Sequence, residues 1–322
     1  MRKAALVLLC AIFLNIPAPG LARPYHISVS QFVEHPALDA VLKGFQDYMR
    51  DHQVEVEYKI HNAQANMATA GQIGNQIMGE APDLILAIAT PTSQACAQAL
   101  KKSPDMQKTP LLFTAVTDPV KAGLVKDLQH PGANITGVSD MLPVDKHLAM
   151  VKTFLPQMKK LGFLYNAGEV NSKTLVPLFR AEGKKLGFEL VEATISKSSE
   201  VYQAVKSLVG RVDAVFIPTD NTVVSALESA IKVCEENHLP LFNADVDSVK
   251  RGSIAAMGFD YYKHGYQTGA MAERILKGAD PAVTPVETQK ELELHINLKA
   301  ARAMGVTVPP ALKAKADKIY EE

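Results

Sequence analysis

Two ten-residue stretches, "DLILAIATPT" (83–92) and "DAVFIPTDNT" (213–222), decide the fold of this 322-residue chain. Each starts with an aspartate, continues as an apolar run and ends in polar residues, and the two starts lie 130 residues apart. An uninterrupted apolar run is typical of a strand that is covered on both faces of a parallel sheet. "PLLF" (110–113) and "PLF" (240–242) repeat the offset. We therefore predict two similar α/β lobes in tandem, joined near residue 138, with chance similarity of two buried strands as the alternative.

Short β-branched runs alternate with amphipathic segments on both sides of these stretches. Apolar residues recur at helical spacing over 36–51, whereas 54–60 alternates with period two, like a half-exposed edge strand. Such alternation of strands and helices predicts a doubly wound α/β layer. The expected strands are 25–29, 54–60, 84–89, 110–116, 162–166, 189–195, 213–218, 239–244, 253–259 and 292–296, and the expected helices are 36–51, 65–80, 92–103, 199–209, 221–236 and 264–277, with two more from 172 and 298.

The N-terminus reads as a secretory signal. Arg2 and Lys3 precede the apolar run 4–16, and the small-residue pattern ending at Ala22 follows. A basic start, a 13-residue apolar run and a small-x-small site predict cleavage after Ala22. The alternative is an N-terminal core helix. No later run reaches the ~20 apolar residues of a membrane span, so we expect a periplasmic or otherwise exported protein that is soluble after cleavage.

Composition narrows the possible partners. Without Arg2 and Lys3 the chain has 32 basic and 34 acidic residues, so it carries no electrostatic footprint for nucleic acid. Cys96 and Cys234 fall at apolar positions of helical segments, which favours buried, unpaired thiols over a disulfide bridge. The histidines form no HxH or HxxxH pair, so the sequence does not predict a metal site.

Polar residues follow the predicted strands, where open parallel sheets bind their ligands. These six stretches are 30–35, 90–94 and 116–119 in the first lobe and 166–172, 218–221 and 244–247 in the second. Each residue alone has an equally good interpretation as a helix N-cap. The motifs GxGxxG, GxxxxGK[ST], HExxH and GxSxG do not occur, which favours a binding protein over an enzyme. An exported enzyme without such a motif is the alternative.

Several stretches together resemble one family over residues 25–308. They are "VEHPALDAVLKGF", "APDLILAIATPTSQA", "PLLFTAVTDPVKAGLV", "PGANITGVSD", "LYNAGEVNS", "VDAVFIPTDNTVVSALESA", "DSVKRGSIAAMGFDYYKHGYQTGAMA" and "HINLKAARAMGV". In this order they resemble the ABC-transporter substrate-binding proteins typified by the tryptophan- and tyrosine-binding proteins. "FTAVTDP" combined with "PTDN" and "GFDYY" is the distinctive part.

The resemblance implies an α/β fold, that of the type I periplasmic binding proteins, in which two Rossmann-like lobes are joined by a hinge of three strands. We expect the chain to cross between lobes near 137–139, 259–261 and 285–287. Apart from the signal peptide 1–22, the N-terminal lobe would comprise 23–138 plus 260–286, and the C-terminal lobe 139–259 plus 287–322.

The resemblance also implies that the lobes close on a small solute and deliver it, as a monomer without a cofactor, to a membrane permease and its ATPase. The implied ligand is an amino acid, with an aromatic side chain as one option. Thr92 and Ser93 would take its α-carboxylate, and Asp220 and Asp245 its ammonium. Phe32, Tyr165 and Phe259 would pack its side chain, and the remaining candidates are Gln31, His35, Thr90, Thr117, Asp118, Asn166, Glu169, Thr219 and Asn221. A solute other than an amino acid, or a sensor that serves a separate receptor, stays open.

Overall fold

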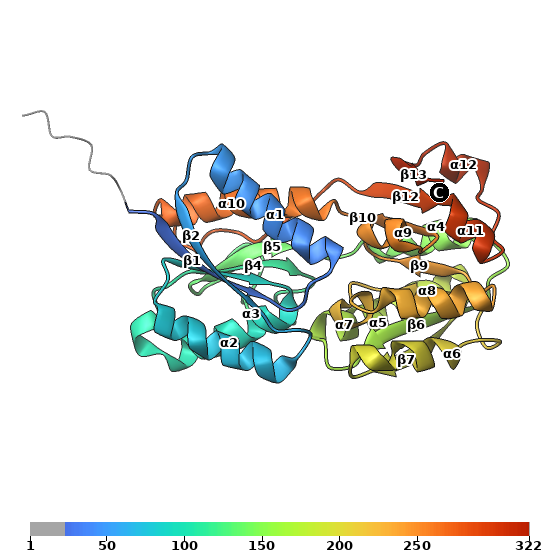
Figure 1. Cartoon of the computed structure of the whole chain (residues 1–322), viewed down its shortest axis with the longest axis horizontal. Coiled ribbons are helices and arrows are strands. Elements are labelled where there is room, and N and C mark those ends of the chain that lie inside the picture. Colours follow the sequence, from blue (N-terminus) through green and yellow to red (C-terminus); the bar gives the residue numbers. More distant parts are fainter. Residues whose placement is uncertain (1–22, 322) are drawn as a thin grey trace, which may run out of the picture.

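A computed structural model describes residues 23–321 as two lobes side by side (Figure 1), while the expected signal peptide at 1–22 lies outside the described residues. The first lobe has a parallel six-stranded sheet, in the order β11-β5-β4-β3-β1-β2. Its strands are β1 (Tyr25–Gln31), β2 (Val56–Asn62), β3 (Leu84–Ile88), β4 (Leu111–Val116), β5 (Ile135–Ser139) and β11 (Glu287–Thr288).

The second lobe has a seven-stranded sheet, in the order β13-β12-β10-β9-β8-β6-β7, in which β10 and β12 pair antiparallel. Its strands are β6 (Lys160–Asn166), β7 (Glu189–Ile195), β8 (Ala214–Ile217), β9 (Leu241–Asn243), β10 (Ala255–Gly258), β12 (Glu293–Asn297) and β13 (Lys318–Tyr320).

Helices pack against both sheets. Those of the first lobe are α1 (Pro36–Asp51), α2 (Met67–Glu80), α3 (Thr90–Lys102) and α10 (Tyr261–Leu276). Those of the second lobe are α4 (Val144–Phe154), α5 (Val170–Leu186), α6 (Val201–Lys206), α7 (Asn221–Val224), α8 (Leu227–Glu236), α9 (Asp247–Arg251), α11 (Leu298–Ala303) and α12 (Pro310–Lys313). Among the described residues no helix is both long and apolar enough to cross a membrane.

The internal repeat predicted from the sequence is present in the structure. The order β5-β4-β3-β1-β2 in one sheet matches β10-β9-β8-β6-β7 in the other. The two aspartates that open the repeated stretches have the same role. Asp83 accepts a hydrogen bond of 2.8 Å from the amide of His26 at the start of β1. Asp213 accepts one of 2.8 Å from the amide of Lys160 at the start of β6. The predicted two-lobed α/β fold is thus confirmed.

The chain crosses between the sheets three times. It leaves β5 for α4, leaves β10 for α10, and passes from β11 to β12. Ser139 and Glu287, which we had placed in the C-terminal lobe, pair in the sheet of the first lobe. Because α10 and β11 return to the first lobe, the tail of the chain is shared between the two lobes.

Several elements differ from the sequence-based expectation, which did not include the short elements α9, α12, β11 and β13. The helix expected over 221–236 is broken between α7 and α8, where the Ser225 hydroxyl donates to the carbonyl of Thr222 at 2.8 Å. Such local side-chain bonds compete with the helix. Strand β5 and helix α4 were not among the expected elements, because β5 is short, contains Gly137 and lies in a Pro/Gly-rich stretch.

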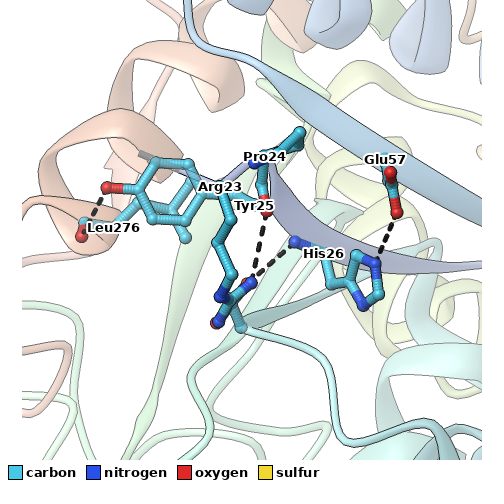
Figure 2. A network of polar contacts seen from close by, with 7 residues as sticks. Arg23, Pro24, Tyr25, His26, Glu57 and Leu276 are labelled. Carbon is cyan, nitrogen blue, oxygen red and sulfur yellow. Dashed lines mark hydrogen bonds and ion pairs between the residues drawn. The ribbon is translucent and has the colours of Figure 1, made fainter. Parts of the chain in front are cut away.

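Side chains of neighbouring elements fix strand β1 where the described chain begins. The ring of His26 lies 2.6 Å from the carboxylate of Glu57 on β2, and the hydroxyl of Tyr25 donates to the carbonyl of Leu276 at the end of α10 (Figure 2). Elsewhere, both Cys96 and Cys234 are buried free thiols, as the sequence predicted.

Candidate functional site

A small cavity lies where the carboxyl ends of the two sheets meet. Its volume is about 20 Å³, which is room for about one water-sized group. Five of the candidate residues line it: His35 from the first lobe, and Thr219, Asp220, Asn221 and Asp245 from the second. The other lining residues are Ala37, Leu38, Ala115, Asp140, Val224 and Tyr261.

His35 brings a free polar atom to this cavity. It is the N-cap of α1, and its Nδ1 accepts from the amide of Leu38 at 3.5 Å. Its Nε2 is buried and has no hydrogen-bond partner among the described residues. Because burial disfavours the charged ring, the pKa of His35 falls to about 4. In the neutral ring with Nδ1 as acceptor, Nε2 carries the proton, so His35 can donate to a ligand in the cavity.

Asp220, by contrast, is occupied by its own lobe. One carboxylate oxygen accepts from the amide of Val223 at 2.8 Å and caps α7. The other accepts from the amide of Asn166 and the hydroxyl of Ser172, both at 2.6 Å. Burial and the neighbouring Glu169 raise the pKa of Asp220 to about 8.

Glu169 is a second buried acid whose oxygens are taken by the protein. One oxygen accepts from the amide and the hydroxyl of Thr222, at 2.9 and 2.7 Å. The other accepts from the side chains of Asn221 and Asn171, at 2.6 and 2.9 Å. This network orders the loop between β8 and α7 and holds Asn221 at the cavity.

A chain of hydroxyl groups leads from the second lobe to Asp140, which follows β5 at the first crossing. The hydroxyls of Thr219 and Thr117 lie 3.2 Å apart and join the two lobes. Thr117 also contacts one carboxylate oxygen of Asp140 at 3.1 Å, and Tyr261 donates to the other at 2.8 Å. Burial disfavours the charged form of Asp140 and raises its pKa, although both hydroxyls hydrogen-bond to the carboxylate.

The cavity is therefore acidic. Asp140, Asp220 and Asp245 are at least 96% buried, and no lysine or arginine stands among the described residues that line the cavity. Asp245 accepts from the amide and the hydroxyl of Ser248 at the start of α9, at 2.8 and 2.7 Å. A cavity of this kind favours a ligand with a cationic group.

The start of α3 offers a different chemistry. The hydroxyls of Thr92 and Ser93 donate to the carbonyls of Ile88 and Ala89, at 2.9 and 2.8 Å. The hydroxyl of Thr90 is buried and has no partner in the described chain. Ala89, just before the helix, has a left-handed φ of 86°, an unusual conformation for a residue with a side chain. Helix α3 contacts α5 of the second lobe, so it lies at the junction of the lobes.

The remaining candidates lie away from the cavity lining. Phe32 belongs to the core of the first lobe, and Tyr165 packs in the core of the second, where its hydroxyl donates to Glu192. Gln31 donates to Asp39, Asp118 caps its own turn, Asn166 bonds to Thr222, and Phe259 is buried at the second crossing. The ring positions expected to pack a ligand side chain are thus not among those that line the cavity.

Six lining residues were not singled out from the sequence, and three of them bear on the chemistry of the site. Asp140 and Tyr261 stand in "GVSD" and "GFDYY", two of the stretches that carried the family resemblance. Asp140 comes directly after β5, and Tyr261 is the first residue of α10, which follows β10. Ala115 lines the cavity with a left-handed φ of 52°, at an irregularity in the pairing of β4 with β5. The position of the crossings was the signal that could have identified Asp140 and Tyr261.

Comparisons with known proteins agree with this geometry. Residues 26–320 match the family model described as ABC transporter substrate binding protein. A tyrosine-binding protein of Clostridioides difficile is 42% identical over 285 residues, which cover 87% of this chain and 81% of that protein.

Two solved structures share the fold at substantial identity. An ABC domain in complex with L-Trp from Streptococcus pneumoniae is 32% identical with a TM-score of 0.87, over 92% of this chain and 100% of that one. The ligand-free, open structure of a substrate-binding protein with adhesive properties from Clostridium difficile is 37% identical with a TM-score of 0.68, over the same shares.

The family model covers nearly all of the described chain, and these relatives are binding proteins of transporters, not enzymes. No group of His, Cys, Asp or Glu in residues 23–321 is arranged to hold a metal ion. From its repeated lobes, its acidic cavity and its relatives, the chain belongs to the ABC transporter substrate-binding protein family.

Proposed function

We propose that this protein captures an aromatic amino acid, with tyrosine and tryptophan as the first choices, between its two lobes. The observation that carries the proposal is that the ligands named for two relatives match the acidic cavity of this protein. One relative is named for tyrosine and another was solved with L-Trp, at 42% and 32% identity. Both ligands carry an ammonium group, which the acidic cavity suits.

Both charged ends of an amino acid find matching groups at the junction of the lobes. The ammonium would lie in the acidic cavity, which is lined by the sequence-based candidates Asp220 and Asp245 and by Asp140 at the first crossing. The α-carboxylate would lie at the start of α3, where the hydroxyl of Thr90 is free and the helix dipole favours an anion. His35 Nε2 supplies a further donor.

Capture would require the lobes to move apart and close again. The cavity of about 20 Å³ is far smaller than an amino acid, and the threonine pair 117/219 bridges the lobes. The structure is also more similar to the L-Trp complex than to the open relative, although the open relative has the higher identity. This supports a closed arrangement here, which a ligand that bridges both lobes would favour.

The family membership supports a role in import. We infer that the protein is exported by the segment 1–22, works as a monomer, and delivers its ligand to a membrane permease with an ATPase. Mass spectrometry of the exported protein should then find Arg23 as its first residue.

A ligand screen tests the proposed function. Protein stripped of ligand by unfolding and refolding is heated with each of the twenty amino acids, and calorimetry then gives the Kd of every hit. A ligand at ~100 times its Kd should add ~2.7 kcal/mol to the free energy of unfolding.

The screen includes tyramine and tryptamine, which lack the carboxylate, as well as hexoses. If tyramine binds more tightly than tyrosine, the ligand would be assigned as a simple amine and not as an amino acid, since the acidic cavity suits both. A melting shift with a hexose and with no amino acid would overturn the proposal.

A further inference from the structure

We propose that Asp140 binds the ammonium group of the ligand and thereby selects amino acids over otherwise identical acids without the amine. This inference rests on the proposed function and assigns a residue that neither the sequence motifs nor the relatives' names identify. It concerns a carboxylate at the first crossing between the lobes, beside the start of α10.

The other three acids of the region already serve helix starts. Asp220 and Glu169 accept from backbone amides at the start of α7. Asp245 accepts from the amide and the hydroxyl of Ser248 in α9. Each of these three acids therefore already has backbone N–H donors of a helix start as partners.

Asp140 has no such partner. The two hydrogen bonds that the structure gives its carboxylate come from the hydroxyls of Thr117 and Tyr261. Two neutral hydroxyls leave room for further donors, since a carboxylate offers about four acceptor positions. At 2% exposure, its charge is shielded from water. A buried carboxylate without a cation is unfavourable, and the ammonium of a ligand would supply that cation.

The surroundings of Asp140 suit a small cationic group. The cavity has room for about one water-sized group, and an ammonium group is about that size. Ala115 and the ring of Tyr261 enclose it from the first lobe. His35 also lines the cavity, and its Nε2 is buried without a hydrogen-bond partner among the described residues, so a ligand could satisfy a further polar atom here.

The position also links binding to closure. Asp140 belongs to the first crossing and Tyr261 follows the second, while Thr117 lies at the end of β4 and contacts Thr219 of the other lobe. An ammonium held by Asp140 would therefore sit among groups that meet only when the lobes are closed.

The test compares each amino acid with its counterpart that lacks the amine. Calorimetry gives the Kd of L-tyrosine, 3-(4-hydroxyphenyl)propanoate, L-tryptophan and indole-3-propanoate for wild-type protein, Asp140→Asn, Tyr261→Phe and the control Asp105→Asn. Asp105 is exposed in the first lobe and is not among the residues that line the cavity. The quantity measured is the preference, which is the ratio of the two dissociation constants within a pair.

We expect Asp140→Asn to lower the preference by about 30-fold or more, as removal of one partner of a buried charge pair does. Asp105→Asn should leave it unchanged. Tyr261→Phe keeps the carboxylate and removes one of its two hydroxyl donors, which leaves more of its charge to the ammonium, so the preference should rise above that of the wild type. It keeps the proposal testable if Asp140→Asn does not fold.

Two results overturn the inference while the proposed function stands. One is an unchanged preference in Asp140→Asn. The other is an equal loss of affinity for both members of each pair in Tyr261→Phe, which would give the contact between Tyr261 and Asp140 a role in the hinge alone. If wild-type protein binds no amino acid, the proposed function itself fails.

Discussion

At the scale of single residues, Asp220 shows that a side chain can line a ligand cavity and still be a structural group. Its three hydrogen bonds tie the start of α7 to the last residue of β6 and to α5. Removing the carboxylate would leave three buried donors without a partner, and each buried unpaired group destabilises a protein by about 1–3 kcal/mol. Asp220 is therefore more than a simple helix cap, whatever it contributes to ligand binding.

Asp220 also predicts how stability depends on pH. Its pKa is about 8 in the folded protein, against an ordinary value of 3.8, because of burial and Glu169. The folded state keeps a proton that the unfolded chain releases, so this group reduces stability as pH rises from about 4 to 8. The side chain in Asp220→Asn resembles the protonated carboxyl group. The amount by which this variant is less stable than the wild type should therefore decrease as pH rises from about 4 to 8.

Urea unfolding at pH 5, 6.5 and 8 checks this expectation. Burial raises the pKa of Asp140, and burial together with Asp245 raises that of Asp247. These two groups therefore also make the stability of the wild type fall as pH rises. The exposed Asp105→Asn serves as control and should match the wild type at all three values. A stability difference for Asp220→Asn that grows with pH would contradict the assignment.

The candidate residues that line the cavity and those that do not differ in one physical respect. His35, Asp220 and Asp245 lie in the loops that follow strands, and the carboxyl ends of parallel strands meet at one edge of a sheet. Which side of the strand a residue faces is decided by packing. Phe32 and Tyr165 also stand at strand ends, but their rings fill the cores of the lobes.

At the scale of elements, the close pair of helices α1 and α10 fixes one wall of the site. A Cβ at Gly265 would lie 1.9 Å from the carbonyl oxygen of Val41, and one at Gly44 would lie 2.0 Å from that of Tyr262. These glycines let two backbones approach where any side chain would separate them. Because α1 starts after His35 and α10 starts at Tyr261, their separation would move both residues.

We therefore expect Gly265→Ala to lower the free energy of unfolding by about 1–3 kcal/mol. Gly71→Ala in α2 is the matched control, since a Cβ there meets nothing within 4 Å. It should raise stability by about 0.5–1 kcal/mol, because alanine favours a helix more than glycine does. Thermal and urea unfolding measure both. Equal effects of the two substitutions would show that the helices separate freely.

Elements with a clear local pattern could be predicted, and elements defined by their neighbours could not. Helix α1 and strand β7 have the predicted limits, and β2 is an edge strand as its alternation indicated. Strand β5 has only five residues and depends on pairing with β4, where a Cβ at Gly137 would lie 2.0 Å from the carbonyl oxygen of Phe113. Its glycine weakens the local strand signal and is required by the tertiary contact.

At the scale of the whole molecule, the repeat explains why the site lies between the lobes. Two sheets of the same strand order present their carboxyl ends to each other, so loops at corresponding positions face one cavity. Three crossings allow the lobes to separate without unfolding either sheet. The 130-residue offset predicted this plan, whereas how far the lobes close depends on contacts such as Thr117 with Thr219.

The native thiols allow closure to be tested by a disulfide. Cys96 and Cys234 are buried, and burial raises the pKa of each to about 12, so neither forms the reactive thiolate near neutral pH. Cysteines introduced at the lobe junction would therefore be the ones that oxidise. The hydroxyls of Thr117 and Thr219, 3.2 Å apart on opposite lobes, mark suitable positions.

Oxidised Thr117→Cys/Thr219→Cys should stay closed, because the new bond joins the lobes where they touch. Small-angle scattering should then give one radius of gyration with and without ligand, whereas the reduced form should become more compact when ligand is added. Uptake and release of ligand should be slowed at least about tenfold by oxidation and restored by a thiol reductant, since exchange requires opening. The single variant Thr117→Cys controls for loss of the hydroxyl. Ligand exchange as fast in the oxidised as in the reduced protein would show that a ligand enters without separation of the lobes.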